Sequence, residues 1–289
     1  MKVFVTGGTG FVGSYVIDEL ERDFEIILPV RYPDNIKDIS PKVIPVLFKE
    51  SISELIIEHK PDIVINLLGI LNEEPKKGST FNKVHVDYVR EIVDGSQKIG
   101  VKKIIHLSAL GADINSRSKY ARTKALGERA IIDSKVDYLI LRPSIILGKG
   151  QKLFADLEKF SVLTPIIFAP QGYVQPVHIM DVIDIIRKGV MEPQFKNQIV
   201  ELCGNRIITY RELFEFVLSY IGKRRIVLAM PSKFFWLMLP VFKLFPEPPI
   251  TEDQLYLLEK DNICSGRFPT QKDILGKVRN PFNLNGSTV

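Results

Sequence analysis

Cysteine is scarce in this chain, whose 289 residues include only Cys203 and Cys264. There is no CxxC pair, and none of the four histidines stands at metal-ligand spacing from either cysteine. We therefore expect no disulfide framework and no metal site, which fits a reducing cytoplasm.

Long apolar runs and an excess of one charge are missing as well. No stretch reaches the roughly 18 uninterrupted apolar residues that a membrane-spanning helix needs, and glycines end the apolar residues 3–5 too early for an export signal. The 39 basic and 34 acidic residues leave a net charge of +5 that is spread along the chain, so we expect no nucleic-acid partner. With 45% hydrophobic and 25% charged residues, the composition is that of a folded protein with one large domain or two closely joined ones.

Short apolar runs alternate with segments of helical period in the first half of the chain. The pattern predicts strands at residues 2–6, 25–30, 62–68, 103–107 and 138–142, and helices at residues 11–22, 52–59, 82–99 and 118–134. This alternation indicates parallel strands joined by crossover helices. The expected fold class is therefore α/β, with a doubly wound parallel sheet of the Rossmann type.

A glycine-rich turn follows the first predicted strand and opens the first predicted helix. Glycines at this place allow a tight turn and a close approach of the backbone to a pyrophosphate, and the helix N-terminus offers N–H groups to the phosphates. The residues expected to contact a dinucleotide here are Gly7, Thr9, Gly10, Phe11, Val12 and Gly13.

Arg31 follows the second predicted strand, where many proteins of this type have an acidic residue. An acid at this place binds the ribose 2′-hydroxyl of NAD, whereas an arginine suits the 2′-phosphate of NADP. We therefore predict NADP(H) as the preferred cofactor, with NAD(H) as the alternative. The other interpretation of Arg31 is a solvated charge at a strand end.

The composition changes after Gly148-Lys149-Gly150, where prolines become frequent and the regular alternation stops. We place a dinucleotide-binding domain at residues 1–150 and a smaller mixed α/β C-terminal domain, for substrate or interaction, at residues 151–289. Residues 174–190 again have the pattern of a strand and a helix and are expected to return to the first domain. Residues 280–289 are expected to fray.

Two motifs resemble the short-chain dehydrogenase/reductase superfamily, especially its extended and atypical branches. They are TGGTGFVG at residues 6–13 and YARTK at residues 120–124. The resemblance implies that Lys124 binds the nicotinamide ribose and lowers the pKa of Tyr120, whose phenol exchanges a proton with the substrate. A second YxxxK pair, Tyr256 with Lys260, lies outside the place of the family's motif.

Other positions take a role only through this resemblance. The family places a Ser or Thr beside the substrate carbonyl, and here either Ser108 or Ala109 occupies that position, so the third catalytic residue is Ser108 or is missing. His178 is expected to be a structural hydrogen-bonding residue. The remaining expected cofactor contacts are Leu67, Leu68, Gly69, Pro143 and Ser144.

The order of motifs is most similar to one atypical group, which contains the accessory NADPH-binding subunit of respiratory complex I and its stand-alone bacterial relatives. These motifs include residues 66–71, 106–112, 120–128 and 251–255. The resemblance leaves two hypotheses open. One is an NADP(H)-dependent oxidoreductase that acts on an apolar carbonyl substrate, and the other is a non-catalytic NADPH-binding assembly or sensor protein. A nucleotide-sugar epimerase or dehydratase is disfavoured because the C-terminal half is apolar and shows no arginine set for a diphosphate.

Residues 231–245 form the most unusual stretch, because they are apolar nearly all round, with Lys233 and Lys243 on either side of their apolar centre. This segment could cap an apolar substrate pocket, contact a protein partner, lie at a membrane surface, or be a buried helix of the second domain. The expected location is the cytoplasm, and this segment allows a position peripheral to the membrane.

Overall fold

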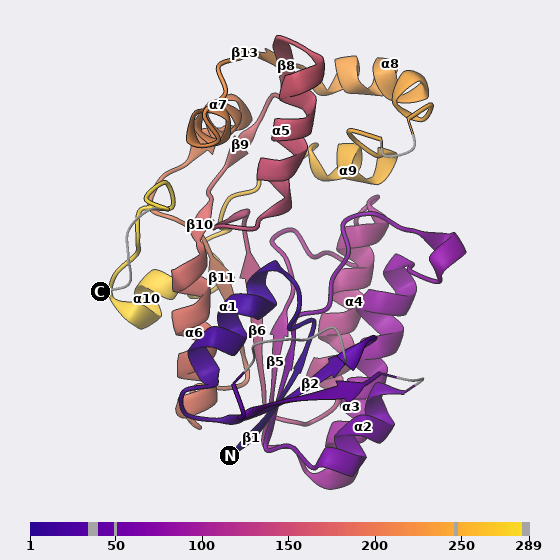
Figure 1. The fold of residues 1–289 in the computed structure, drawn as a ribbon, viewed down its shortest axis with the longest axis vertical. Helices are drawn as coiled ribbons and strands as arrows, with labels where there is room; N and C mark the ends of the chain where they lie inside the picture. The colour runs from indigo at the N-terminus through magenta and orange to yellow at the C-terminus, as the bar shows by residue number, and fades with distance from the viewer. Residues whose placement is uncertain (34–39, 49–50, 246–247, 285–289) are drawn as a thin grey trace.

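A seven-stranded parallel sheet forms the centre of the protein, for which the computed structural model describes residues 1–33, 40–48, 51–245 and 248–284 (Figure 1). The strand order is β11-β6-β5-β4-β1-β2-β3, and every neighbouring pair is parallel. The strands are β1 (Lys2–Thr6), β2 (Glu25–Val30), β3 (Val43–Leu47), β4 (Ile63–Asn66), β5 (Lys103–Leu107), β6 (Tyr138–Pro143) and β11 (Gln198–Leu202). The predicted doubly wound α/β sheet is therefore confirmed.

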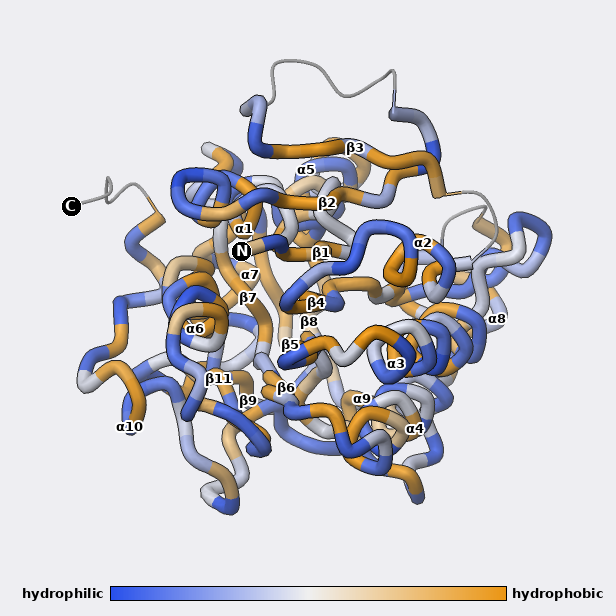
Figure 2. The backbone as a smooth tube through the Cα atoms, turned by 90° about the horizontal axis from the view of Figure 1, so that it is seen from below, coloured by the Kyte–Doolittle hydropathy of each residue, from blue (hydrophilic) through white to orange (hydrophobic). Residues whose placement is uncertain are grey.

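Helices cover both faces of this sheet, because its strands are apolar on both sides. Val3 and Val5 of β1 pack in the core under α1 (Phe11–Leu20) and α6 (Ile179–Met191), while Phe4 points to the opposite core. That second core lies under α2 (Ile52–His59), α3 (Tyr88–Ile99) and α4 (Lys119–Asp133). Figure 2 shows the sheet between these two helical layers.

Two strands of the sheet were not predicted from the sequence. β3 contains Pro45, which argues against a central strand, but β3 lies at the edge of the sheet, where a missing N–H is tolerated. β11 occupies the opposite edge and comes from the region in which the regular alternation has stopped. The helix predicted at residues 82–99 begins with a π-helical segment, Lys83–Asp87, before α3.

The C-terminal part of the chain adds a smaller set of elements above the carboxyl ends of the large sheet (Figure 1). It has three two-stranded sheets, which pair β7 with β10, β9 with β12, and β8 with β13. Its elements are β7 (Ile146–Leu147), α5 (Lys152–Leu163), β8 (Ile166–Pro170), β9 (Tyr173–Val174), β10 (Val177–His178), β12 (Ile208–Thr209), α7 (Tyr210–Tyr220), β13 (Ile226–Met230), α8 (Ser232–Phe242), α9 (Glu252–Leu257) and α10 (Gln271–Leu275). The boundary near residue 150 stays a prediction, although α6 and β11 belong to the layers of the large sheet.

No disulfide framework was expected from the sequence, but Cys203 and Cys264 form a disulfide with a Cα–Cα distance of 6.0 Å. The pairing depends on a tertiary contact that leaves no sequence signal. Gln271 holds the backbone of Cys203, and Glu201 accepts hydrogen bonds from Ser265 next to Cys264. Since disulfides are rare in the reducing cytosol, this bond removes the support that the cysteine count gave to a cytoplasmic location.

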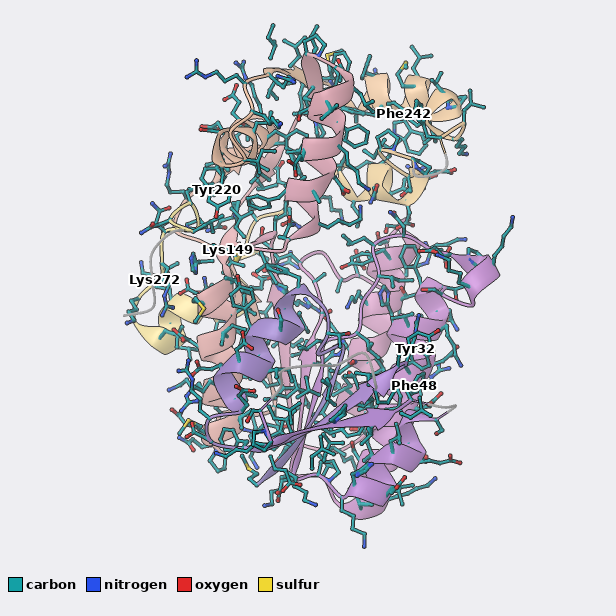
Figure 3. All side chains as sticks on the ribbon, in the orientation of Figure 1. Tyr32, Phe48, Lys149, Tyr220, Phe242 and Lys272 are labelled. Carbon is teal, nitrogen blue, oxygen red and sulfur yellow. A yellow bond between two sulfur atoms is a disulfide. The ribbon has the colours of Figure 1, made fainter. Side chains whose placement is uncertain are left out.

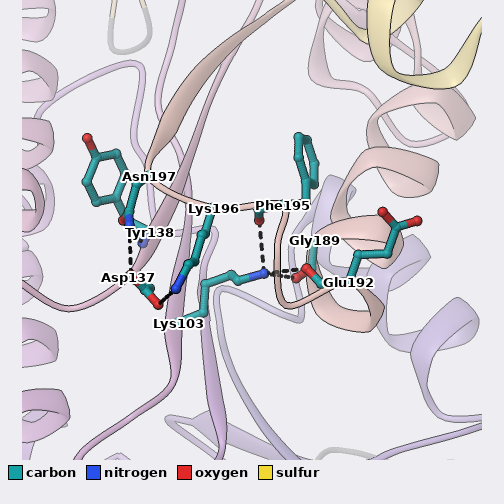
Figure 4. Close-up of polar contacts among 8 residues, drawn as sticks. All are labelled: Lys103, Asp137, Tyr138, Gly189, Glu192, Phe195, Lys196 and Asn197. Carbon is teal, nitrogen blue, oxygen red and sulfur yellow. Dashed lines mark hydrogen bonds and ion pairs between the residues drawn. The ribbon is translucent and has the colours of Figure 1, made fainter.

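Lys103 fixes the sheet to the C-terminal end of α6 (Figure 4). Its buried Nζ donates hydrogen bonds to the backbone carbonyls of Gly189, Glu192 and Phe195 at 2.8–2.9 Å. These are carbonyls at or just beyond the end of the helix, which lack partners within the helix itself. The Lys103 side chain on β5 therefore stabilises the position of α6 against the sheet.

Among the described residues, no helix is long and apolar enough to cross a bilayer. The same residues contain no group of His, Cys, Asp or Glu side chains that could hold a metal ion.

Candidate functional site

The glycine turn lies between the C-terminal end of β1 and the start of α1. Gly7 has φ of +72°, and a Cβ there would lie 3.0 Å from the carbonyl carbon of Leu67. At Gly13 a Cβ would come within 2.3 Å of the carbonyl oxygen of Gly7, so helix and loop can approach only without side chains. The turn lies between β1 and β4, where the strand order reverses and where doubly wound sheets bind their ligands.

The N-terminus of α1 is left open for a ligand. Gly10 is the N-cap residue, and no described side chain forms a capping hydrogen bond there. By contrast, Ser118 caps α4 by accepting a bond from the N–H of Ala121. The N–H groups and positive partial charge at the start of α1 therefore suit an anion such as a pyrophosphate.

A cavity of about 420 Å³ adjoins the glycine turn on the side of β2. Its walls include Thr9, the exposed Arg31 and Leu68, and the aromatic side chains of Tyr32 and Phe48, which Figure 3 shows close together. None of the residues that line this cavity in the described part of the chain is acidic. Arg31 is thus a cation beside a cavity that has aromatic walls.

Asn66 connects the carboxyl ends of three adjacent strands. Its Oδ1 accepts hydrogen bonds from the Thr6 hydroxyl at 2.7 Å and from the N–H of Leu68 at 3.2 Å, while its Nδ2 lies 3.0 Å from Nδ1 of His106. This buried network holds residues 67–69 over the glycine turn. Asn66 and His106 belong to motifs recognised in the sequence, but the bond between them was not predicted.

Tyr120 and Lys124 lie one turn apart on α4 and line the same large cavity. The Lys124 Nζ donates a hydrogen bond to the carbonyl of Leu107 at 3.0 Å, and a Cβ at Gly69 would lie 3.3 Å from this nitrogen. The lysine is therefore at the carboxyl ends of β4 and β5, beside the glycine turn, where a nicotinamide ribose would be expected.

Burial changes the protonation chemistry of this pair. Desolvation lowers the pKa of Lys124 to about 8, against the opposing effect of the Glu128 carboxylate. Desolvation and the nearby Asp253 raise the pKa of Tyr120 to about 12. The direction is opposite to the lowering of the Tyr120 pKa that the resemblance implies, and the phenol stays protonated at neutral pH.

Asp253 was not predicted as a site residue, although it belongs to a motif recognised in the sequence. Its carboxylate accepts hydrogen bonds from the Ser118 hydroxyl at 2.7 Å and from the N–H of Lys119 at 2.5 Å and of Tyr120 at 3.2 Å. A carboxylate is favourable at a helix N-terminus, so α9 fixes the start of α4 from above. The sequence signal available was the capping box of Thr251 and Gln254, which marks the start of α9.

His85 is the second residue that the sequence did not identify. Its Nε2 accepts a hydrogen bond from the N–H of Ile70 at 3.2 Å, and its Nδ1 lies 3.0 Å from the Thr123 hydroxyl, which donates to helix carbonyls. Burial, Lys124 and His106 lower the pKa of His85 to about 2, so the ring is neutral. It packs edge-on against Tyr120 with 5.3 Å between ring centroids.

The large cavity, of about 1510 Å³, extends from the glycine turn to α8. Ser108 and Ala109 both line it, but the Ser108 hydroxyl is buried and has no hydrogen-bond partner among the described residues, whereas Ala109 is partly exposed. Ser144 also lines it and donates its hydroxyl proton to Asn262 at 2.6 Å, beside Pro143. His178 instead caps α6, where its Nδ1 accepts a bond from the N–H of Met180.

Comparison with known proteins identifies the family. The model of the NAD dependent epimerase/dehydratase family matches residues 3–186. The chain belongs to this family. It is 28% identical over 282 residues to the mitochondrial NADH-ubiquinone oxidoreductase 40 kDa subunit of Neurospora crassa, covering 93% of this chain and 74% of the relative. The similarity to the complex I group is thereby confirmed.

A rat relative and a bacterial structure agree with this assignment. The mitochondrial NADH dehydrogenase [ubiquinone] 1 alpha subcomplex subunit 9 of Rattus norvegicus is 27% identical over 296 residues, which cover 97% of this chain and 77% of the relative. The structure of a nucleoside-diphosphate-sugar epimerase from Staphylococcus aureus aligns over 99% of both chains, with a TM-score of 0.74 and 15% identity. At that identity the structural likeness shows the fold.

Proposed function

We propose that the protein is an NADP(H)-dependent oxidoreductase that transfers a hydride to or from an apolar carbonyl substrate. The observation that carries the proposal is the position of Tyr120 and Lys124 in the wall of a large cavity beside an open glycine turn. The turn and the uncapped α1 fit a pyrophosphate, and the cavity at Arg31 fits the adenosine end.

Preference for NADP(H) rests on Arg31. This exposed guanidinium adjoins the candidate adenosine cavity, and none of the described residues in that cavity could accept a bond from a 2′-hydroxyl through a carboxylate. A guanidinium forms strong charge-assisted bonds with phosphate. NAD(H) remains the alternative, since the family takes its name from that cofactor.

The charges in the large cavity support an apolar substrate over a nucleotide sugar. The described basic residues that line it, apart from Lys124, are already in ion pairs: Arg117 with Glu259, Lys152 with Asp156, and Lys260 with Asp113. A sugar diphosphate would need free cations. The rest of the wall is rich in Phe, Leu and Ile side chains, among them Phe160, Phe235 and Phe242.

The residues divide the chemistry as follows. The bound cofactor would supply or accept the hydride. During reduction Tyr120, which is protonated at neutral pH, would give its phenolic proton to the substrate oxygen. Lys124 would bind the nicotinamide ribose, and Asp253 and His85 would hold Tyr120 in place.

The first experiment is mass spectrometry of the nucleotide released from the purified protein. The second measures NADPH oxidation with a panel of apolar ketones and quinones. We expect Tyr120→Phe to lose activity by about 100-fold or more while its Kd for NADPH stays unchanged. Tyr256→Phe, in the second YxxxK pair, is the matched control and should stay active. Failure to bind either nucleotide would refute the proposal.

One observation favours a second candidate, a protein that holds NADPH without turnover. The Ser108 hydroxyl is buried, and Ala109 presents no hydroxyl to the cavity. If Ala109 occupies the substrate-orienting position, Ala109→Ser should raise turnover and Ser108→Ala should leave it unchanged. NADPH that is bound tightly but never oxidised by wild type, Ala109→Ser or any substrate of the panel would favour the non-catalytic candidate.

A further inference from the structure

Exposed apolar side chains gather at the end of the molecule farthest from the amino ends of the large sheet, where Figure 1 shows α8, β8 and β13. This apolar surface is formed by α8, by the paired strands β8 and β13, and by the C-terminal end of α5. We call it the apical surface, and its most exposed side chains include Leu163, Phe168, Ile226, Leu237, Leu244 and Phe245. Leu163, Leu237 and Leu244 are 76%, 78% and 82% exposed, so side chains that normally avoid water lie in it.

The β8–β13 pair and α8 are apolar on both of their sides. In the β8–β13 pair, Ile167 and Val227 face the core, while the outward positions are Phe168, Ile226 and Leu228 rather than polar residues. In α8, Phe235 and Leu239 are buried, and the opposite side presents further apolar residues. Folding of this chain alone therefore leaves one apolar side of the β8–β13 pair and of α8 exposed.

The segment that forms most of the apical surface, residues 223–245, is basic. Residues 223–245 carry five basic side chains and no acidic one, which equals the net charge of the whole chain, +5. They include Lys223, Lys233 and Lys243. The Nζ of Lys243 lies 3.5 Å from Oε2 of Glu252. Two copies of this surface would bring like charges together, whereas anionic headgroups would complement them.

The apical surface is also the outer end of the large cavity. Leu163, Phe168 and Phe245 line the cavity and are exposed to solvent at the same time. Phe242 of α8, labelled in Figure 3, lines the cavity beside them. An apolar molecule that leaves a bilayer through this opening would move from one apolar environment into another, without passing through water.

We propose that the apical surface docks onto anionic lipid bilayers, so that the large cavity opens toward the acyl chains and receives its ligand from the membrane. The bilayer is the partner that offers both an apolar phase for the exposed Leu and Phe side chains and anionic headgroups for the basic rim. That the ligand is an apolar substrate rests on the proposed function, whereas the docking itself does not.

The test uses the full chain in flotation with phosphatidylcholine vesicles, with and without phosphatidylglycerol. We expect binding to the mixed vesicles, weakened about tenfold or more by Leu237→Glu with Leu244→Glu and reduced by added salt. The matched control is Met191→Glu with Ile44→Glu, which changes exposed apolar residues outside the apical surface. No flotation of the wild type, or equal flotation of both double variants, would overturn the docking.

Trp236 gives a second readout, because it is the single tryptophan of the chain and lies in α8. Phosphatidylcholine with brominated acyl chains should quench its fluorescence when mixed with phosphatidylglycerol. Flotation without quenching would mean that headgroups alone are bound and would refute the opening toward the acyl chains. A dimer in sedimentation that Leu237→Glu with Leu244→Glu abolishes, with no vesicle binding, would make this surface an interface between copies.

Nucleotide binding is measured on the same samples and separates this inference from the proposed function. A protein that binds NADPH but does not float has lost only the docking. A protein that floats but binds no nucleotide retains the docking and overturns the proposed function. The glutamate variants should keep the wild-type Kd for NADPH, which also shows that they are folded.

Discussion

Lys124 connects the stability of the protein to pH through its burial. Its side chain is buried on α4, and its pKa falls from 10.5 to about 8. At about 1.4 kcal/mol for each pH unit, the ammonium form costs about 3 kcal/mol in the folded protein relative to the unfolded chain. The cost is largest at neutral pH, where the lysine carries its proton in both states.

The stability contribution of Lys124 should therefore increase with pH. Between about pH 8 and 10.5 the unfolded chain binds more protons at this site than the folded protein, and unfolding becomes less favourable as pH rises. A Lys124→Met variant lacks this dependence. The free energy of unfolding of wild type minus that of Lys124→Met should rise by about 2–3 kcal/mol between pH 7 and pH 10.

Urea unfolding of both proteins at a series of pH values measures this difference. Lys119→Met is the matched control, because it removes one exposed positive charge from the same helix. The reasoning is refuted if the wild-type and Lys124→Met curves stay parallel across this range, or if their difference falls with pH. The variant should also bind NADPH more weakly, which isothermal titration calorimetry would show.

Three further results are expected. In calorimetry Arg31→Ala should weaken NADPH binding by about tenfold or more and leave NADH binding unchanged; an equal loss for both nucleotides would contradict the phosphate contact. Replacing Cys203 and Cys264 by serine opens a loop of 61 residues, so urea unfolding should show a loss of about 4 kcal/mol, and no loss would argue against the disulfide. Lys103→Met removes one donor from each of three carbonyls and should cost about 3 kcal/mol, compared with little change for the exposed Lys98→Met.

The central sheet could be predicted because its physics is local. Strands buried on both faces must be apolar along their length, and the glycine turn requires residues without side chains at Gly7 and Gly13. Both constraints concern residues that are close together in the sequence, so the sequence pattern reveals them. The sequence did not predict the two edge strands. An edge position tolerates Pro45 in β3, and β11 lies outside the region of regular strand–helix alternation.

The candidate site was predictable only where one element supplies both partners. Tyr120 and Lys124 share α4, so their spacing could be read from the sequence. The roles of Asp253 and His85 depend on segments that meet only after folding. Asp253, for example, accepts a hydrogen bond from the N–H of Tyr120, which is 133 residues away in the sequence. The disulfide between Cys203 and Cys264 has the same origin. The pKa of Tyr120 followed burial and Asp253 rather than the lysine, which the motif alone could not show.

The C-terminal segment connects the apical surface to the candidate site through a chain of contacts. α8 carries Leu237 at the apical surface, and it packs on α9 through a shared core that contains Phe235, Leu239 and Leu255. α9 in turn holds the N-terminus of α4 through Asp253, which accepts hydrogen bonds from the N–H groups of Lys119 and Tyr120. These contacts run without a break from α8 to the helix that positions the phenol. The same segment therefore forms the entrance of the cavity and fixes the group proposed to carry out its proton transfer.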